Sequence, residues 1–184
     1  MRKVLAICGS TKQHSSSLSI LKYIAENFQN NFHLEIYEAL AALPHFNPDL
    51  DNEDRLPAEV RTLRQKIQEA DGVLFSTPEY VFSMPSSLKN ALEWNVSTVN
   101  FSSKPTAMIV AAASGKKAFE SLALVLTSIE AVLPEQSRLL IGGAKGKIGK
   151  GGAILNEETK AQIHTTVQSF IDTMNVERKP TKYE

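Results

Sequence analysis

The sequence predicts an α/β fold built on a doubly wound, five-stranded parallel sheet. Short apolar segments rich in branched residues alternate along the chain with longer segments whose apolar residues recur at helical spacing. This alternation favours right-handed crossovers, which place helices on both faces of the sheet. The 184 residues match one domain, which we expect to span residues 1–175, followed by a flexible tail over residues 176–184.

The first strand is predicted over residues 3–8, an apolar run that ends at Gly9, and a helix is predicted from Ser17 onward. The apolar residues of this helix are Leu18, Leu21, Ile24, Ala25 and Phe28. Residues 32–37 alternate apolar and polar side chains, as expected for a strand at the edge of the sheet. Residues 60–70 then form a second helix, whose apolar stripe consists of Val60, Leu63, Ile67 and Ala70.

The central strand is predicted to begin at Val73 and to end before Pro78, which cannot continue the pairing. Pro85 is expected to open the next helix, because proline is tolerated in the first turn. The remaining predicted elements are a strand over 105–113, a helix over 118–133, a strand over 138–141 and a helix over 157–174.

Charge and composition exclude several classes of function. Lys+Arg and Asp+Glu both number 20, so no nucleic-acid partner is expected. The apolar segment after Lys3 is shorter than the roughly 7–15 residues of a signal peptide, and no segment reaches the about 20 apolar residues of a membrane span. We therefore expect a cytoplasmic protein without a membrane segment. Cys8 is the single cysteine, cannot form an intrachain disulfide, and is expected to be a core thiol.

The loop over residues 9–17 has the composition of a phosphate cradle. Its hydroxyl and cationic side chains are Ser10, Thr11, Lys12, Ser15, Ser16 and Ser17. The amides in the first turn of a helix have no partner within the helix, so they favour an anion together with these hydroxyls. A competing interpretation is that Ser15 or Ser16 only caps the helix. The Walker spacing is absent, which makes a single phosphate a better fit than a triphosphate.

The loop after the central strand is the second candidate site. A parallel strand delivers its loop to the carboxyl edge of the sheet, where open α/β folds bind ligands. Pro78 stiffens the backbone, so the amides of Glu79 and Tyr80 can be aimed at a flat, partly polar ligand with little loss of entropy.

These residues resemble the signature of the NADPH-dependent FMN reductase family. The matching positions are Pro78, Glu79, Tyr80, Ser83, Pro85, Leu88, Lys89, Asn90, Ala91 and Trp94. The resemblance implies a flavodoxin-like fold with strand order 2-1-3-4-5. It also implies an FMN-dependent enzyme that oxidises NADPH or NADH and reduces small acceptors such as quinones, azo or nitro compounds. Hydride would pass through flavin N5 in ping-pong order. Family members form homodimers or homotetramers, for which we expect residues 85–94 to be the interface.

The resemblance also assigns the cofactor-binding residues. Ser10 and Ser15 match the family's phosphate loop, while Lys12 and Ser17 stand where the family has arginine and asparagine, and Ser16 lies between them. The ring is expected to lie against Pro78, Glu79, Tyr80 and Val81, with Ser114 and Gly115 at its other edge.

Besides Ser17, three features depart from the family pattern. Val81 replaces an asparagine, which removes an amide that could reach the flavin. Lys12 keeps the positive charge but lacks the planar fork of arginine. The turn at residues 113–118 contains a single glycine, which leaves less room for close contact between backbone and ring.

We expect no catalytic side chain, because the cofactor would carry the chemistry. We also expect no metal site, because the histidines are scattered and the acidic segment 49–54 lacks the glycine of a calcium loop. The lysine and glycine run over 145–152 is expected to be a mobile solvated loop, with a position near the NADPH phosphates as the alternative.

Two other functions stay open. One is a flavodoxin-like binding or regulatory domain with weak or lost FMN binding, as the departures at Ser17 and Val81 would allow. The other is a small electron-transfer flavoprotein. The neutral chain disfavours the second, because such proteins commonly carry an acidic docking face.

Overall fold

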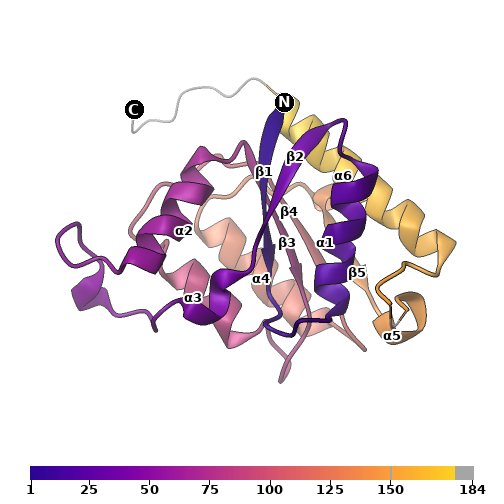
Figure 1. Ribbon diagram of the computed structural model, residues 1–184, viewed down its shortest axis with the longest axis horizontal. Coiled ribbons are helices and arrows are strands. Elements are labelled where there is room, and N and C mark those ends of the chain that lie inside the picture. The colour runs from indigo at the N-terminus through magenta and orange to yellow at the C-terminus, as the bar shows by residue number, and fades with distance from the viewer. Residues whose placement is uncertain (150, 177–184) are drawn as a thin grey trace.

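The computed structural model describes residues 1–149 and 151–176. Within these residues it contains a five-stranded sheet with strand order β2-β1-β3-β4-β5, and every neighbouring pair is parallel (Figure 1). The strands are β1 (Arg2–Cys8), β2 (Phe32–Tyr37), β3 (Gly72–Thr77), β4 (Thr106–Ala111) and β5 (Arg138–Ile141). The predicted flavodoxin-like fold and strand order are confirmed.

Helices cover both faces of this sheet (Figure 1). Over the same residues, the helices are α1 (Ser16–Asn27), α2 (Ala58–Glu69), α3 (Ser86–Glu93), α4 (Lys116–Ser128), α5 (Ala144–Lys147) and α6 (Glu157–Asn175). Short 3₁₀ helices occur at Ala39–Ala42, Pro48–Leu50 and Glu135–Ser137. None of these helices is long and apolar enough to cross a membrane.

The core consists of two apolar layers separated by the sheet. Successive residues of a strand point to opposite faces, so Val4 and Ala6 of β1 pack with α1 and α6, whereas Leu5 and Ile7 pack with α2, α3 and α4. All residues of β3 are buried, as expected for a central strand covered on both faces.

Two predicted elements differ from the structure by more than two residues at an end. The helix predicted over 118–133 ends at Ser128, because the chain turns at Glu130 with φ 64° and Val132 then pairs with Pro105 beside β4. The segment predicted as a mobile loop over 145–152 begins instead as the short helix α5, which is anchored by a hydrogen bond from the Ala144 amide to the Ala112 carbonyl at 3.1 Å. Of the predicted flexible tail, residues 177–184 lie outside the described residues.

Parallel strands place their following loops at one edge of the sheet, which is the lower edge in Figure 1. The loops after β1, β3 and β4 therefore lie together at the carboxyl ends of the three central strands, and this edge is where open α/β sheets bind ligands.

Candidate functional site

Gly9 brings the end of β1 into direct contact with the end of β3. Its amide donates to the Ser76 carbonyl at 2.8 Å, and a Cβ at this position would lie 2.3 Å from the Thr77 Oγ1. Only a residue without a side chain fits this approach. The loop that follows therefore leaves the sheet beside the central strand.

The hydroxyls of this loop organise the start of α1. Ser15 is the N-cap of α1, and its Oγ accepts a hydrogen bond from the Leu18 amide at 3.1 Å. The Ser10 Oγ accepts from the Lys12 amide at 3.3 Å.

Ser17 differs from the other hydroxyls of the loop. It is 1% exposed, and its Oγ has no hydrogen-bond partner within residues 1–149 and 151–176. A buried polar group without a partner costs about 1–3 kcal/mol. Such a group beside the free amides of a helix N-terminus is a candidate contact for an anionic ligand.

The loop residues line a groove of about 1360 Å³ that opens at the carboxyl edge of the sheet. Seven of the predicted site residues line this groove, namely Ser10, Lys12, Ser15, Ser16, Ser17, Pro78 and Tyr80. The other predicted residues, Glu79, Val81, Ser114 and Gly115, lie beside it and not in its lining. A second hollow of about 1080 Å³ lies near the start of β4 and along the C-terminal half of α6, and no predicted site residue lines it.

Glu79 joins two of the loops at this edge. Its carboxylate accepts hydrogen bonds from the amides of Gly115 at 3.2 Å, Lys117 at 2.9 Å and Ala118 at 3.0 Å. These amides belong to the first turn of α4, where they lack partners within the helix. The bonds, led by that from Ala118, hold the pKa of the Glu79 carboxyl below its ordinary value. The Glu79 side chain is therefore committed to binding α4, which leaves its backbone as the part that can face a cofactor.

The tip of the loop is a tight turn between Tyr80 and Ser83. The Tyr80 amide donates to the Ser83 carbonyl at 2.9 Å, and the Ser83 amide returns a bond at 3.0 Å. The two central residues, Val81 and Phe82, have φ angles of 49° and 55°. Two successive positive φ angles are typical of a type I′ turn, which favours Asn-Gly. Val81 and Phe82 are 96% and 79% exposed, so the tip presents strained apolar residues to solvent.

Replacing Val81 with asparagine is expected to raise the free energy of unfolding by about 1 kcal/mol, because asparagine tolerates the left-handed conformation far better than a β-branched residue. Urea unfolding of the flavin-free protein measures this change. Val99→Asn is the matched control, since Val99 is 65% exposed and its φ is not positive. Equal changes in the two variants would show that lost apolar exposure, and not relief of backbone strain, is responsible.

Ser114 and Gly115 form the opposite edge of the predicted ring site. Gly115 has φ 83° and is the N-cap of α4, and a Cβ there would lie 2.7 Å from Leu140 Cδ1. Ser114 is exposed. The single glycine of this turn therefore occupies the position that most requires one.

Cys8 lies beneath the phosphate loop. Its Sγ donates to the Ser10 carbonyl at 3.5 Å, and burial raises the pKa of its thiol above the usual range. A buried thiol of this kind is not a nucleophile at neutral pH. No group of three or more His, Cys, Asp or Glu side chains that could hold a metal occurs in the described ranges.

Trp94 and Asn90, two residues of the signature motif, hold the loop at residues 44–46 by hydrogen bonds. The Trp94 Nε1 and the Asn90 Nδ2 both donate to the Pro44 carbonyl, at 2.8 and 2.9 Å. The Asn90 Oδ1 accepts from the Phe46 amide at 2.8 Å. Trp94 is fully buried, which supports core packing as its role. All apolar side chains within residues 85–94 are buried. Only polar side chains of this segment, which was the expected subunit interface, are accessible for a contact.

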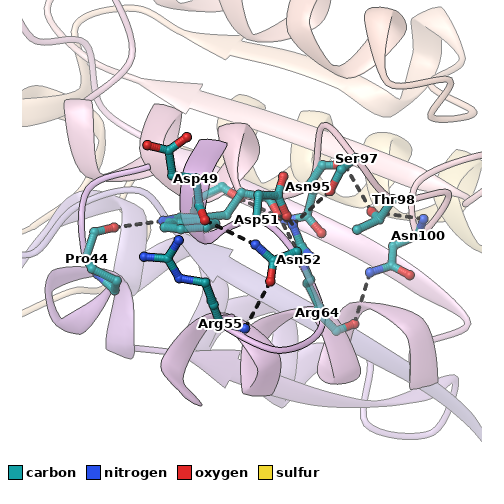
Figure 2. Close-up of polar contacts among 12 residues, drawn as sticks. Pro44, Asp49, Asp51, Asn52, Arg55, Arg64, Asn95, Ser97, Thr98 and Asn100 are labelled. Carbon is teal, nitrogen blue, oxygen red and sulfur yellow. Dashed lines mark hydrogen bonds and ion pairs between the residues drawn. The ribbon is translucent and has the colours of Figure 1, made fainter. Parts of the chain in front are cut away.

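A polar cluster extends this anchor to α2 (Figure 2). Arg64 donates to the Asp51 carboxylate at 2.6 Å, to the Trp94 carbonyl from its Nε at 2.7 Å, and to the Ser97 Oγ at 3.2 Å. The Asp51 side chain is only 7% exposed. This cluster fastens the acidic segment at residues 49–54 to α2 and α3, which gives that segment a structural role.

The groove also contains residues that the sequence did not predict as site residues. Lys22 and Tyr23 of α1 line it, as does Lys160 of α6. Lys145 of α5 lines it as well, and it belongs to the run over 145–152 for which a position near the NADPH phosphates was the alternative to a mobile loop. The signal that could have identified Lys22 is a polar stripe on α1, formed by Ser15, Ser19, Lys22 and Glu26 at helical spacing.

Known proteins resemble this chain over most of its length. The family model described as NADPH-dependent FMN reductase matches residues 2–146. The NADH:(hydroxy)cinnamate reductase subunit CrdA of Vibrio ruber is 33% identical over 173 residues, which cover 91% of this chain and 84% of that protein. An NADPH azoreductase of a Bacillus species is 30% identical over 185 residues, which cover 98% and 97% of the two chains.

A solved structure shares the fold. FerB, a flavoenzyme NAD(P)H:(acceptor) oxidoreductase from Paracoccus denitrificans, aligns with a TM-score of 0.82 and 24% identity over 95% of this chain and 97% of that chain. The matched family model, the two relatives and this shared architecture agree with one another. The chain belongs to the NADPH-dependent FMN reductase family.

Proposed function

We propose that this protein is an FMN-dependent NAD(P)H oxidoreductase that reduces small acceptors such as quinones, azo or nitro compounds. The observation that carries the proposal is the phosphate cradle at the start of α1, where the buried Ser17 hydroxyl lacks a partner in the described residues and lines a large groove. Family membership and the names of the relatives support the reaction class.

The residues of the cradle fit the phosphate of FMN. Ser10, Lys12, Ser15, Ser16 and Ser17 would hold it, because they supply hydroxyls, helix amides and a positive charge. A phosphate oxygen would provide the acceptor that the Ser17 hydroxyl lacks.

The remaining predicted site residues would hold the ring. The backbone of residues 78–81 would cup it, and Ser114 and Gly115 would border it, since Glu79 ties these two loops together. Bound FMN would supply hydride transfer from NAD(P)H to the acceptor in ping-pong order. The chain would bind and orient the reactants, and no side chain is required as an acid or base.

We further propose a cytoplasmic homodimer or homotetramer. Val96 and Val99, directly after α3, are 63% and 65% exposed and would be covered in such an assembly. Because residues 85–94 expose no apolar side chain, the contact would lie beyond the end of α3.

The Ser17→Ala variant tests the phosphate site. It is expected to weaken FMN binding about tenfold, because a hydrogen bond to a charged group contributes about 1.5–3 kcal/mol. Removing the unpartnered hydroxyl should at the same time stabilise the flavin-free protein. Calorimetric titration with FMN and urea unfolding measure the two effects.

Ser76→Ala is the matched control. The Ser76 Oγ is also buried without a partner in the described chain, but Ser76 does not line the groove. This variant should be stabilised without any change in FMN affinity. Wild-type protein that retains no flavin after incubation and desalting, and that does not oxidise NADPH with excess FMN, would contradict the proposed function and favour a binding domain without flavin.

A further inference from the structure

The tip of the loop after β3 presents an unpartnered aromatic side chain to solvent. Tyr80, Val81 and Phe82 are consecutive and all exposed. Within the part of the chain that the structure describes, the Phe82 ring makes no contact with another aromatic ring. Contiguous exposed apolar surface marks interaction or ligand sites, whereas apolar residues scattered singly do not. The tip is therefore a surface that a ligand or partner could cover.

The backbone at this tip is held in an unfavourable conformation. Val81 and Phe82 both have positive φ angles, which suit glycine and asparagine. An Asn-Gly turn would make the same connection without strain and without apolar side chains. Strain of this kind clusters at active sites and ligand clamps, where the surrounding structure maintains it. The aromatic side chain at this position is thus better explained by function than by folding.

Both ends of the tip are fixed to the rest of the molecule. On the amino side, the Glu79 carboxylate accepts hydrogen bonds from amides in the first turn of α4. On the carboxyl side, Met84 is buried in the core. The backbones of Tyr80 and Ser83 are joined across the turn by two hydrogen bonds. The tip that carries Phe82 therefore has a defined position, and a ligand that packs on it loses little entropy by ordering the loop.

Phe82 lies at the rim of the groove that would hold the cofactor. Pro78 and Tyr80 line this groove, and its lining stops short of Phe82. The cofactor would therefore leave the Phe82 ring uncovered. An electron acceptor enters from solvent and leaves as product, so it meets the rim of the ring site and not the phosphate cradle. The uncovered aromatic ring is available to such a molecule.

We propose that Phe82 selects flat aromatic electron acceptors, such as quinones, by packing against them at the rim of the ring site. This inference rests on the proposed function and names the residue that sets the acceptor preference. Aromatic rings attract one another in offset-stacked or edge-to-face arrangements, beyond the gain from area burial. A quinone becomes a hydroquinone by gaining one hydride equivalent, supplied by NAD(P)H, and one proton, supplied by water. Phe82 takes no part in this transfer and acts on acceptor affinity alone.

Binding of menadione, a naphthoquinone, to the oxidised FMN-loaded enzyme tests the inference without turnover, because no NAD(P)H is present. Calorimetric titration is expected to show about five-fold weaker binding in Phe82→Ala, the loss that corresponds to one aromatic pair. Phe82→Tyr keeps the ring and should bind menadione as the wild type does. FMN affinity should be the same in all these proteins. Leu124→Ala is the matched control, because Leu124 is also exposed but lies on α4, more than one helical turn beyond its start.

Steady-state kinetics supply a second readout. With menadione, KM should rise about five-fold in Phe82→Ala at constant kcat, as expected when binding is lost equally from the ground state and the transition state. With ferricyanide, an acceptor without an aromatic surface, KM and kcat should keep their wild-type values. Unchanged menadione binding in Phe82→Ala, or an equal change with both acceptors, overturns the inference.

Two other outcomes are distinguishable from this result. If a second copy of the chain covers the tip, Phe82→Ala should change the sedimentation coefficient and leave menadione binding unchanged, which overturns the inference. If the proposed function fails, the wild type neither retains FMN nor oxidises NADPH, and the inference falls with it. A wild type that retains FMN and oxidises NADPH, together with no effect of Phe82→Ala on menadione, overturns the inference alone.

Discussion

Replacing Trp94 with alanine is expected to lower the free energy of unfolding by about 3–5 kcal/mol, the usual cost of removing a large aromatic residue from a core. Trp94 is 0% exposed and meets the Phe46 ring edge to face at 5.1 Å. Its Nε1 also holds the Pro44 carbonyl. The variant therefore loses packing and releases the loop at residues 44–46. Urea unfolding monitored by circular dichroism measures the loss.

Trp94→Phe separates packing from hydrogen bonding. It keeps most of the aromatic volume but leaves the Pro44 carbonyl with Asn90 as its remaining partner. A loss of about 1–2 kcal/mol is expected, well below that of the alanine variant. If phenylalanine cost as much as alanine, the hydrogen bond and not burial would hold the loop. Unchanged stability in both variants would contradict the anchoring role of Trp94.

Replacing Glu79 with alanine is expected to weaken FMN binding about thirty-fold and to destabilise the flavin-free protein by about 1 kcal/mol. The stability loss is that of a removed N-cap, since the carboxylate satisfies amides in the first turn of α4. The affinity loss arises because the ligand must then order the loops after β3 and β4 itself. Ordering a residue costs about 1–2 kcal/mol, and a tenfold change in affinity is 1.4 kcal/mol. Calorimetric titration with FMN measures the change.

The Glu79→Gln variant supplies a pH-dependent control. Hydrogen bonds from the α4 amides depress the pKa of Glu79 in the folded state, so its contribution is present above the unfolded pKa and is lost as pH falls through the folded pKa. Glutamine has the same shape but does not titrate in this range. Stability of the wild type should therefore fall more steeply than that of the variant below about pH 4.5. Parallel acid curves would show that Glu79 is not the titrating group.

The elements of the sheet follow from local patterns in the sequence. Residues 32–37 and 138–141 were predicted with the bounds that β2 and β5 have, because alternation and branched apolar runs mark strands locally. The phosphate loop was also predictable, since several hydroxyl side chains between a predicted strand and the start of a predicted helix indicate an anion-binding site. The strand order depended on the family resemblance and not on periodicity.

Elements whose limits depend on distant contacts could not be predicted in this way. The apolar pattern of α4 continues to Leu133, but the helix ends at Ser128 because Val132 pairs beside β4. The helix α5 forms in a lysine and glycine run with no helical pattern, because contacts with the loop after β4 hold its first residue.

By itself, the sequence determined the fold class, the loops at the carboxyl edge and the residue types that suit a flavin phosphate. Only the tertiary structure decided how those residues are used. Glu79 accepts hydrogen bonds from amides up to 39 residues away, and Lys22 of α1 lines the same groove as Lys145 of α5. The spacing of apolar residues indicates which face of a helix or strand is buried. It carries no information about which distant backbone groups meet a side chain, because that depends on the assembled packing of the whole sheet.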